Sequence, residues 1–355
     1  FELSPNVLPF QTPVSSSTVS AYDFDQDGDN DLFVGERFKV ETYGIPSNGY
    51  ILENQGNNNF SIINQEALQN IGLITDSAWA DLNNDGLKDL IISGEWMPLS
   101  VFINQKGKLV NKTEEYGLND TSGYWKTLKV VDINNDGSLD IIAGNKGENS
   151  FFKESMSMFI SDFDNNGTTE QIICYKKNDK YYPVVDRDEL LSQIASLKSK
   201  LLFYKDYANA DMASIFTKEQ IDHAIKLDVK KVNTSVFINK NNTFISQKLP
   251  NEIQYSNVDA IEVFDINDDG NLDIFFGGNQ YLIKPQFGRQ DASKGWLLFS
   301  GNQEFKKVIP LNIKGQIRDF SISKINNRDY LMATINNDSL KVFEILNDRL
   351  KPANN

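Results

Sequence analysis

Short apolar stretches alternate with turn-forming residues along most of the chain, a spacing typical of β-strands. Apolar runs at 90–92, 141–142 and 274–276 each follow a polar segment of nine residues that is rich in Asp, Asn and Gly. A strand, a loop and a returning strand therefore form the local unit. A third strand follows, as in Val101-Phe-Ile-Asn104 and Val236-Phe-Ile-Asn239, often with a fourth. Four short antiparallel strands recurring about every 50 residues predict an all-β fold, a β-propeller.

The polar segments share one pattern. Positions 1, 3 and 5 carry Asp or Asn, position 6 is Gly, and position 9 is a carboxylate. The pattern occurs five times: Asp23-Phe-Asp-Gln-Asp-Gly-Asp-Asn-Asp31, Asp81-Leu-Asn-Asn-Asp-Gly-Leu-Lys-Asp89, Asp132-Ile-Asn-Asn-Asp-Gly-Ser-Leu-Asp140, Asp162-Phe-Asp-Asn-Asn-Gly-Thr-Thr-Glu170 and Asp265-Ile-Asn-Asp-Asp-Gly-Asn-Leu-Asp273.

This pattern suits calcium, which takes six to eight oxygen ligands and accepts carboxylates, amide carbonyls and backbone carbonyls. Glycine at position 6 allows a sharp turn, and position 7 offers its backbone carbonyl. Unlike an EF-hand, the loop has strands on both sides and no Glu at position 12. The alternative is an ordinary Asp-Gly hairpin turn without an ion. The repeats predict about five calcium sites, and the fourth departs most from the pattern, with Asn166 and Glu170. The candidate ligands are Asp23, Asp25, Asp27, Asp29, Asp31, Asp81, Asn83, Asp85, Leu87, Asp89, Asp132, Asn134, Asp136, Ser138, Asp140, Asp162, Asp164, Asn166, Thr168, Glu170, Asp265, Asn267, Asp269, Asn271 and Asp273.

The net charge supports a role for cations. At −14 the chain is acidic, which argues against nucleic acid or anionic lipid as its main partner. Carboxylates clustered in loops without cations would repel one another.

No apolar run is long enough to predict a transmembrane segment.

The repeat spacing is uneven. Asp132 and Asp162 are 30 residues apart, so that blade is either abbreviated or has unusual third and fourth strands; Asp162 and Asp265 are 103 residues apart, too far for one blade. The excess has helical periodicity, and Asp186 and Thr217 begin capping-box patterns. The apolar face consists of Leu190, Leu191, Ile194, Leu197 and Leu201. The chain is therefore divided into propeller blades at 1–185, a helical insertion at 186–226 and the remaining blades at 227–355.

Two segments bear on the number of blades. The repeat at 316–343 keeps the strand pattern but has lost the acids in Lys324-Ile-Asn-Asn-Arg-Asp329, so it predicts a blade without metal. The segment Phe1-Glu-Leu-Ser-Pro-Asn-Val-Leu-Pro9 is similar to Phe244-Ile-Ser-Gln-Lys-Leu-Pro250, which ends a blade. We therefore expect the chain to begin inside a blade, with seven blades in the complete fold and five or six represented here.

With these motifs, the chain resembles FG-GAP/VCBS-repeat propellers, and more closely the surface proteins of Bacteroidota that carry an ASPIC/UnbV module. The stretches that support this resemblance are Tyr43-Gly-Ile-Pro46, Gly49-Tyr-Ile-Leu-Glu-Asn54, Gly94-Glu-Trp-Met-Pro98, Gly144-Asn-Lys-Gly-Glu-Asn149 and Phe287-Gly-Arg-Gln-Asp-Ala292. The resemblance implies an exported, often lipid-anchored protein on the extracellular face of the bacterial outer membrane. It also implies association with a protein partner, such as a TonB-dependent transporter or another outer-membrane complex. It does not imply one activity.

The sequence favours a binding or assembly module over an enzyme. His223 is the only histidine and lies in the helical segment, where a surface or packing role is expected. Cys174 is the only cysteine, which excludes an intrachain disulfide, and its apolar surroundings predict a buried thiol. No combination of nucleophile, base and acid can be argued from these residues. A calcium-dependent polysaccharide hydrolase or lyase is the less favoured alternative.

A carbohydrate-binding surface module is the other alternative, because aromatic rings stack on sugars. Two of the tryptophans lie on strands that enter acidic loops and are expected in the core, whereas Trp96 begins a bend and is a candidate for an exposed contact. The four tryptophans are Trp79, Trp96, Trp125 and Trp296. The helical insertion is the main candidate for a partner surface, although its apolar face is expected to dock onto the propeller.

Overall fold

The computed structural model describes residues 8–40, 42–57, 59–301, 305, 307–346 and 349–352. Within these ranges the fold is mostly β, with antiparallel sheets of four or five strands. Five sheets follow the blade pattern, in which consecutive strands pair side by side, and a sixth has a different order. The predicted all-β, propeller-like fold is confirmed.

The blades hold strands of four to nine residues, apart from the shorter β8 and the added β9. Blade 1 contains β1 (Ser15–Tyr22), β2 (Asp31–Phe38), β3 (Gly49–Asn54) and β4 (Phe60–Ile63). Blade 2 contains β5 (Leu73–Ala80), β6 (Asp89–Met97), β7 (Ser100–Asn104) and β8 (Leu109–Asn111), with β9 (Gly123–Tyr124) added to β6. Blade 3 contains β10 (Thr127–Val131), β11 (Asp140–Gly144), β16 (Ser235–Asn239) and β17 (Phe244–Lys248). Blade 4 contains β18 (Val258–Phe264), β19 (Asp273–Gly278), β20 (Trp296–Phe299) and β21 (Lys307–Pro310). Blade 5 contains β22 (Ile317–Ile325), β23 (Arg328–Ile335), β24 (Lys341–Leu346) and β25 (Arg349–Pro352).

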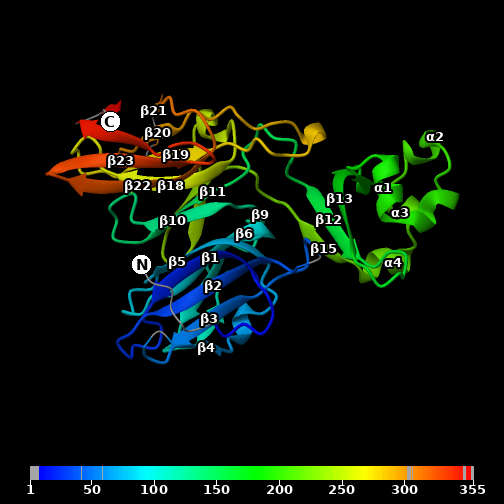
Figure 1. The fold of residues 1–355 in the computed structure, drawn as a ribbon, viewed down its shortest axis with the longest axis horizontal. Coiled ribbons are helices and arrows are strands. Elements are labelled where there is room, and N and C mark those ends of the chain that lie inside the picture. The colour runs from blue at the N-terminus through cyan, green and yellow to red at the C-terminus, as the bar shows by residue number, and fades with distance from the viewer. Residues whose placement is uncertain are drawn as a thin grey trace.

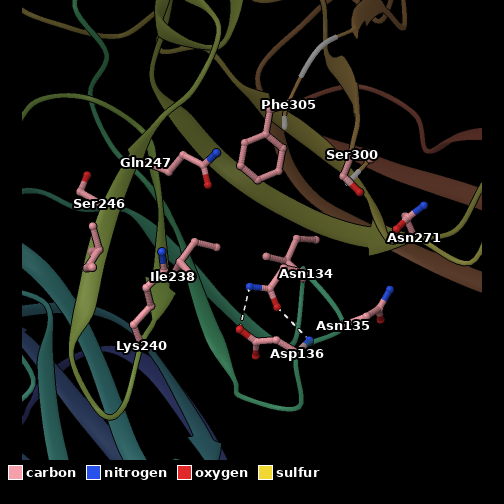
Figure 2. Close-up of a pocket in the computed structure, with 13 residues that line it drawn as sticks. Asn134, Asn135, Asp136, Ile238, Lys240, Ser246, Gln247, Asn271, Ser300 and Phe305 are labelled. Carbon is pink, nitrogen blue, oxygen red and sulfur yellow. Dashed lines mark hydrogen bonds between the residues drawn. The ribbon is translucent and has the colours of Figure 1, made fainter. Parts of the chain in front are cut away.

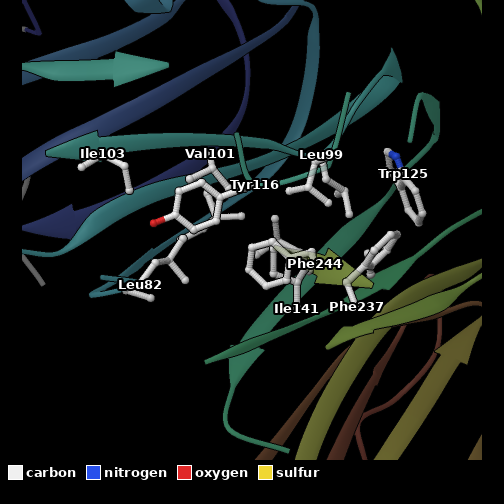
Figure 3. Close-up of a cluster of buried hydrophobic side chains, with 14 residues drawn as sticks. Leu82, Leu99, Val101, Ile103, Tyr116, Trp125, Ile141, Phe237 and Phe244 are labelled. Carbon is white, nitrogen blue, oxygen red and sulfur yellow. The ribbon is translucent and has the colours of Figure 1, made fainter. Parts of the chain in front are cut away.

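The blades stack in chain order. The first strand of each blade contacts the first strand of the next, from β1 through β5, β10 and β18 to β22. Figure 1 shows blade 1 (blue) and blade 5 (red) at opposite ends of this series. Apolar side chains fill the space between neighbouring blades. Between blades 2 and 3, Leu99 and Val101 face Ile141 and Phe237 (Figure 3). Full burial of each such side chain contributes about 1.5–3 kcal/mol, so these interfaces hold the series together.

Blade 3 is interrupted by a long insertion. Residues 145–234 leave the blade after β11 and return at β16, where Ala143 pairs with Ser235. The unusual third and fourth strands of the repeat that begins at Asp132 are thus β16 and β17, which lie after the insertion. In Figure 1 the insertion (green) projects from the blades at one end of the longest axis.

The insertion contains its own sheet. It consists of β12 (Met156–Ser161), β13 (Glu170–Lys177), β14 (Lys180–Pro183) and β15 (Ile225–Asp228). Its order is β14-β13-β12-β15, so the fourth strand pairs with the first strand and not with the third. The fourth acidic loop joins β12 to β13 and therefore belongs to the insertion, outside the five blades. The sequence pattern finds the strand-loop-strand unit but does not reveal this strand order.

Helices lie within the predicted 186–226 segment. They are α1 (Arg187–Gln193), α2 (Tyr204–Tyr207), α3 (Met212–Ile215) and α4 (Lys218–His223). The apolar face expected on one helix is buried, but the helix breaks at Ile194, where φ is −124°, and continues as the 3₁₀ turn η2 (Ala195–Ser199). Asp186 caps α1 by accepting from the Glu189 amide, and Thr217 and Gln220 form a capping box on α4. No helix of the described residues is long and apolar enough to cross a membrane.

Blade 5 corresponds to the repeat that lost its acids. Its first two strands are joined by Asn326 and Asn327 alone, both with positive φ, as in a type I′ hairpin. The short turn has no room for a nine-residue loop. At the other end of the chain, residues 1–7 lie outside the described residues, so the expectation that the chain begins inside a blade stays a prediction. So does the total of seven blades.

Candidate metal sites

The five acidic loops fold alike. Each joins the first strand of a unit to the second, and its last residue is the first residue of that second strand. In each loop the carboxylate at position 1 accepts a hydrogen bond from the amide of the glycine at position 6, as Asp81 does from Gly86 at 2.9 Å and Asp132 from Gly137 at 2.8 Å. These glycines have φ between 84° and 101°, the left-handed region that other residues rarely adopt. The turn therefore requires glycine and folds position 1 back over the loop.

Position 5 tightens the turn. Its side-chain oxygen accepts the amide of position 7, as in Asp136 with Ser138 and Asp269 with Asn271, both at 2.8 Å. The side chains at positions 3 and 5 also approach each other: Asn134 donates to Asp136 at 3.0 Å. The side chains at positions 1, 3 and 5 are thereby gathered on the inside of the turn. Such a group of oxygens is the donor set that calcium prefers.

Position 9 behaves differently, because it is buried. Asp89, Asp140 and Asp273 have no exposed surface, and both oxygens of each accept backbone amides. One oxygen accepts from position 2 of the loop and the other from the residue at or just after the end of the third strand. Burial raises the pKa of each of these three carboxyl groups to about 6, although the backbone hydrogen bonds oppose the shift. Position 9 therefore fastens the loop to its sheet and also offers charge to a cation.

Buried oxygens that lack a hydrogen-bond partner indicate which acidic loops could hold a cation. In the first loop, Oδ1 of Asp23 and Oδ1 of Asp29 are buried without a hydrogen-bond partner, and in the fourth loop so is Oδ1 of Asp164. A buried carboxylate oxygen without a partner is costly unless a cation or water satisfies it. Carboxylate oxygens also converge within 4.8 Å in both loops: in the first from Asp23, Asp25 and Asp27, and in the fourth from Asp162, Asp164 and Glu170. The residues of these two loops fit Ca²⁺.

The fourth loop, the weakest match in sequence, is built into the insertion. Glu170 is 3% exposed and accepts the Phe163 amide at 2.9 Å, as the aspartates at position 9 do in the blades. Its second oxygen accepts from the Thr168 hydroxyl and not from a third strand. Gln220 of α4 donates to the carbonyl of Phe163 at 2.5 Å, so this loop is attached to the helices. A cation here would stabilise the insertion and not a blade.

Sequence reasoning missed the asparagines that end the third strands. The amides of Asn54, Asn104 and Asn239 donate to the position 9 carboxylates of blades 1, 2 and 3 at 2.8, 2.9 and 2.8 Å. The repeated Ser-Val-Phe-Ile-Asn at 100–104 and 235–239 was the available signal. Blade 4 uses Ser300 in the same way, at 3.0 Å.

A second polar group lies where the second strands of several blades end. Glu95 is 7% exposed, contacts Lys126 and Arg37, and accepts from the hydroxyl of Tyr43 at 2.8 Å. Burial alone would raise the pKa of Glu95, but the two cations outweigh it and lower the pKa to about 2. Nearby, burial lowers the pKa of Lys146 to about 7; its ammonium donates to Gln280 at 2.6 Å. Glu95 thus pairs with cations of both neighbouring blades, and the hydrogen bond from Lys146 to Gln280 links blades 3 and 4.

The tryptophans do not form an exposed platform. Trp125 and Trp296 are buried in the cores between blades, and Trp79 packs against Phe24 and Tyr22. The expectation of an exposed Trp96 is wrong. Its φ of 61° turns the ring inward, where it is 4% exposed, lies edge-on to Tyr124, and donates to the hydroxyl of Tyr43 at 3.1 Å.

Neither His223 nor Cys174 belongs to the groups of carboxylates that converge in the first and fourth acidic loops. His223 is exposed on α4, with Nδ1 2.7 Å from the carbonyl oxygen of Glu219. Cys174 is fully buried in the insertion core, as predicted, and burial raises the pKa of its thiol far above the usual range. A thiol in this state is a poor nucleophile.

A cavity of about 660 Å³ lies between blades 3 and 4, beside the third acidic loop. Figure 2 shows Asn134 and Asp136 on one side and Gln247 and Phe305 on another. Ile133, Ile238 and Ile245 contribute apolar surface. The third and fifth loops meet nearby, where Asn135 donates to the carbonyl of Gly270 at 3.0 Å. Amide and apolar side chains thus line this cavity together.

The stacked antiparallel blades and their acidic loops define a propeller-like repeat protein. Residues 23–92 and 81–143 match the family model of the FG-GAP-like repeat. Each match begins at position 1 of an acidic loop, at Asp23 and Asp81, and the two together cover blade 1 after its first strand, all of blade 2 and the first part of blade 3. The chain thus contains FG-GAP-like repeats, which indicate a β-propeller protein-interaction module. No curated protein matches the chain.

Proposed function

We propose that this protein is a non-enzymatic, calcium-stabilised β-propeller that acts as an interaction module on the extracellular face of the bacterial outer membrane. The observation that carries the calcium part is the unpaired Oδ1 of Asp23, buried inside a turn where three carboxylates converge. Five loops with the same backbone turn extend this argument to the series. In this role calcium holds the loops rigid and leaves the blade surfaces free to bind.

The proposed location and partner are supported by the family-specific stretches of the sequence. Gly94-Glu-Trp-Met-Pro98 and Phe287-Gly-Arg-Gln-Asp-Ala292 resemble those of exported surface proteins. The proposed partner is a protein of a transport or secretion assembly, such as a TonB-dependent transporter. The test is purification from native membranes in mild detergent with calcium present. We expect co-purification of an outer-membrane transport or secretion component; recovery of the protein alone would contradict the proposal.

A carbohydrate-binding role is the second candidate, and the cavity between blades 3 and 4 favours it. Amide side chains beside an apolar surface suit sugar hydroxyls and ring faces. Binding on a glycan array that is lost in the Lys240→Ala, Phe305→Ala double variant would favour this role. Binding that persists in this variant would exclude the cavity, and absence of binding by the unmodified protein would count against the role.

A further inference from the structure

The tip of the insertion exposes three consecutive apolar side chains. Leu202, Phe203 and Tyr204 are 62%, 61% and 62% exposed, at the point where the chain passes from η2 into α2. Among the described residues, no other three consecutive large apolar side chains are exposed. In Figure 1, α2 lies at the far end of the insertion, away from the blades. The tip is therefore accessible.

Hydrogen bonds fix the backbone of this tip. The guanidinium of Arg187 donates to the carbonyls of Leu201 and Leu202 at 2.7 and 2.8 Å. It also lies over the ring of Tyr204, 5.2 Å from the ring centre. The amide of Phe203 donates to Asp206 at 2.9 Å. Three hydrogen bonds thus fix the backbone of residues 201–203, and the Tyr204 ring packs against Arg187, while Leu202 and Phe203 stay exposed.

Lysines flank the tip, although the chain as a whole is acidic and Asp206 directly follows Lys205. Residues 196–205 contain Lys198, Lys200 and Lys205 and no acid. The ammonium of Lys205 lies 5.2 Å from the ring centre of Phe203. The nearby acids are engaged locally: Asp188 with Arg187 and the Tyr204 hydroxyl, and Asp206 with the Phe203 amide. Lys198 and Lys205 thus flank the apolar side chains in the chain, whereas the ammonium of Lys200 donates to the carbonyl of Ile215 at 2.8 Å.

We propose that residues 202–204 insert into the headgroup region of an anionic lipid bilayer. Leu and Phe side chains enter the acyl boundary, Tyr favours the interface, and flanking lysines attract anionic headgroups. A lipid surface fits better than a protein partner, because the apolar side chains lie at the far end of a projecting element and have lysines beside them in the chain. The net charge of −14 does not oppose this contact, since charges beyond about 8 Å are largely screened at physiological salt.

The test uses the full chain with vesicles of phosphatidylcholine, with and without phosphatidylglycerol. We expect co-sedimentation with the anionic vesicles, weakened by high salt and reduced about tenfold in the Leu202→Ser, Phe203→Ser double variant. The Lys198→Glu, Lys205→Glu variant is expected to lose binding to the same vesicles. Two matched controls are expected to bind like the unmodified protein. Val19→Ser removes an apolar side chain that is equally exposed, at 62%, on β1, and Lys314→Glu, Lys324→Glu makes the same change in net charge elsewhere.

A second measurement separates loss of contact from loss of fold. In a Phe203→Trp variant, tryptophan emission is expected to shift to the blue on addition of anionic vesicles and not of neutral ones. No sedimentation and no emission shift would overturn the proposal, as would equal binding by the tip and control variants. If a purified membrane protein bound the tip while anionic vesicles did not, the tip would be a protein interface and the lipid assignment would be wrong.

Discussion

Asp140 and Asn239 are 99 residues apart in the chain, yet Oδ1 of Asp140 accepts the backbone amide of Asn239 at 2.8 Å. The other oxygen accepts the amide of Ile133, at 3.2 Å. One buried carboxylate thus joins the acidic loop, the second strand and the third strand of blade 3, although the whole insertion lies between the last two. The same bond spans only 15 residues in blade 2, from Asp89 to Asn104. Blade 3 thus forms the same hydrogen bond between its second and third strands as blade 2 does, despite the insertion.

This geometry predicts different effects at two positions of one loop. Asp140→Asn places an amide donor against backbone donors in a buried site, which costs about 1–3 kcal/mol. The cost remains when calcium is chelated, because the lost hydrogen bonds do not involve an ion. Asp136→Asn changes an exposed side chain in the same loop and keeps an oxygen that can accept from Ser138, so its effect is expected mainly when calcium is present. Urea unfolding of both variants, with and without chelator, measures this difference. Equal behaviour of the two variants in chelator would contradict the structural role of position 9.

A second prediction compares Asp23 with Asp329. Asp23→Ala removes a carboxylate with an unpaired buried oxygen from the first loop, and should lower the melting temperature in millimolar calcium. Asp329 lies on β23, next to a two-residue turn with no acidic loop, so Asp329→Ala should have little effect. Thermal melts in calcium compare the two variants directly. Equal melting temperatures would show that the first loop gains no more from its carboxylate than the degenerate repeat does.

The local units of this fold are visible in the sequence, because each acidic loop carries its own turn residues and flanking apolar strands. The pairing of strands that are far apart in the chain is not visible in the sequence. Nothing near Gly144 announces that its sheet resumes at Ser235, so the insertion is longer than the helical segment and includes the sheet of β12–β15. The exposure of Trp96 is misjudged because a positive φ, which sequence does not show, turns its ring toward Tyr43 and Tyr124.

The candidate metal ligands divide in the same way, into contacts that the sequence reveals and contacts that it does not. The oxygens at positions 1, 3 and 5 are predictable from spacing, since they belong to one short turn. The second role of position 9, as an acceptor that fastens the loop to its sheet, is not predictable from spacing. In blade 3 its second oxygen accepts from a strand that lies far along the chain. The break of the helix at Ile194 likewise depends on how its flanking turns pack against the sheet of the insertion.

A third prediction concerns pH. Burial raises the pKa of Asp89, Asp140 and Asp273 from 3.8 to about 6 in the metal-free fold. Their protonated forms therefore favour the metal-free fold below about pH 4, and this contribution is lost as the pH rises through 6. Calcium requires the ionised carboxylates, so it must displace protons below pH 6. The gain in melting temperature on adding calcium should be larger near pH 7.5 than near pH 5. The same gain at both values would mean that these three carboxylates do not take part in binding.

The last prediction is that calcium removal lowers the melting temperature of the whole protein, because the proposed ions hold loops that join the strands of four blades and the insertion. Binding to the folded state alone stabilises it by about 2.7 kcal/mol per site at a hundredfold excess over Kd. Several loops together should produce a clear fall with chelator, reversed by Ca²⁺. Mg²⁺ should restore little, since it prefers a tight octahedron and keeps its water. Blade 5 has no acidic loop, so calcium can stabilise it only through its neighbour. Hydrogen exchange after chelation should rise first in the loops at 23–31 and 162–170, where carboxylates converge and single oxygens are buried without partners. Superimposable melting curves after exhaustive chelation would show that these loops are turns without ions.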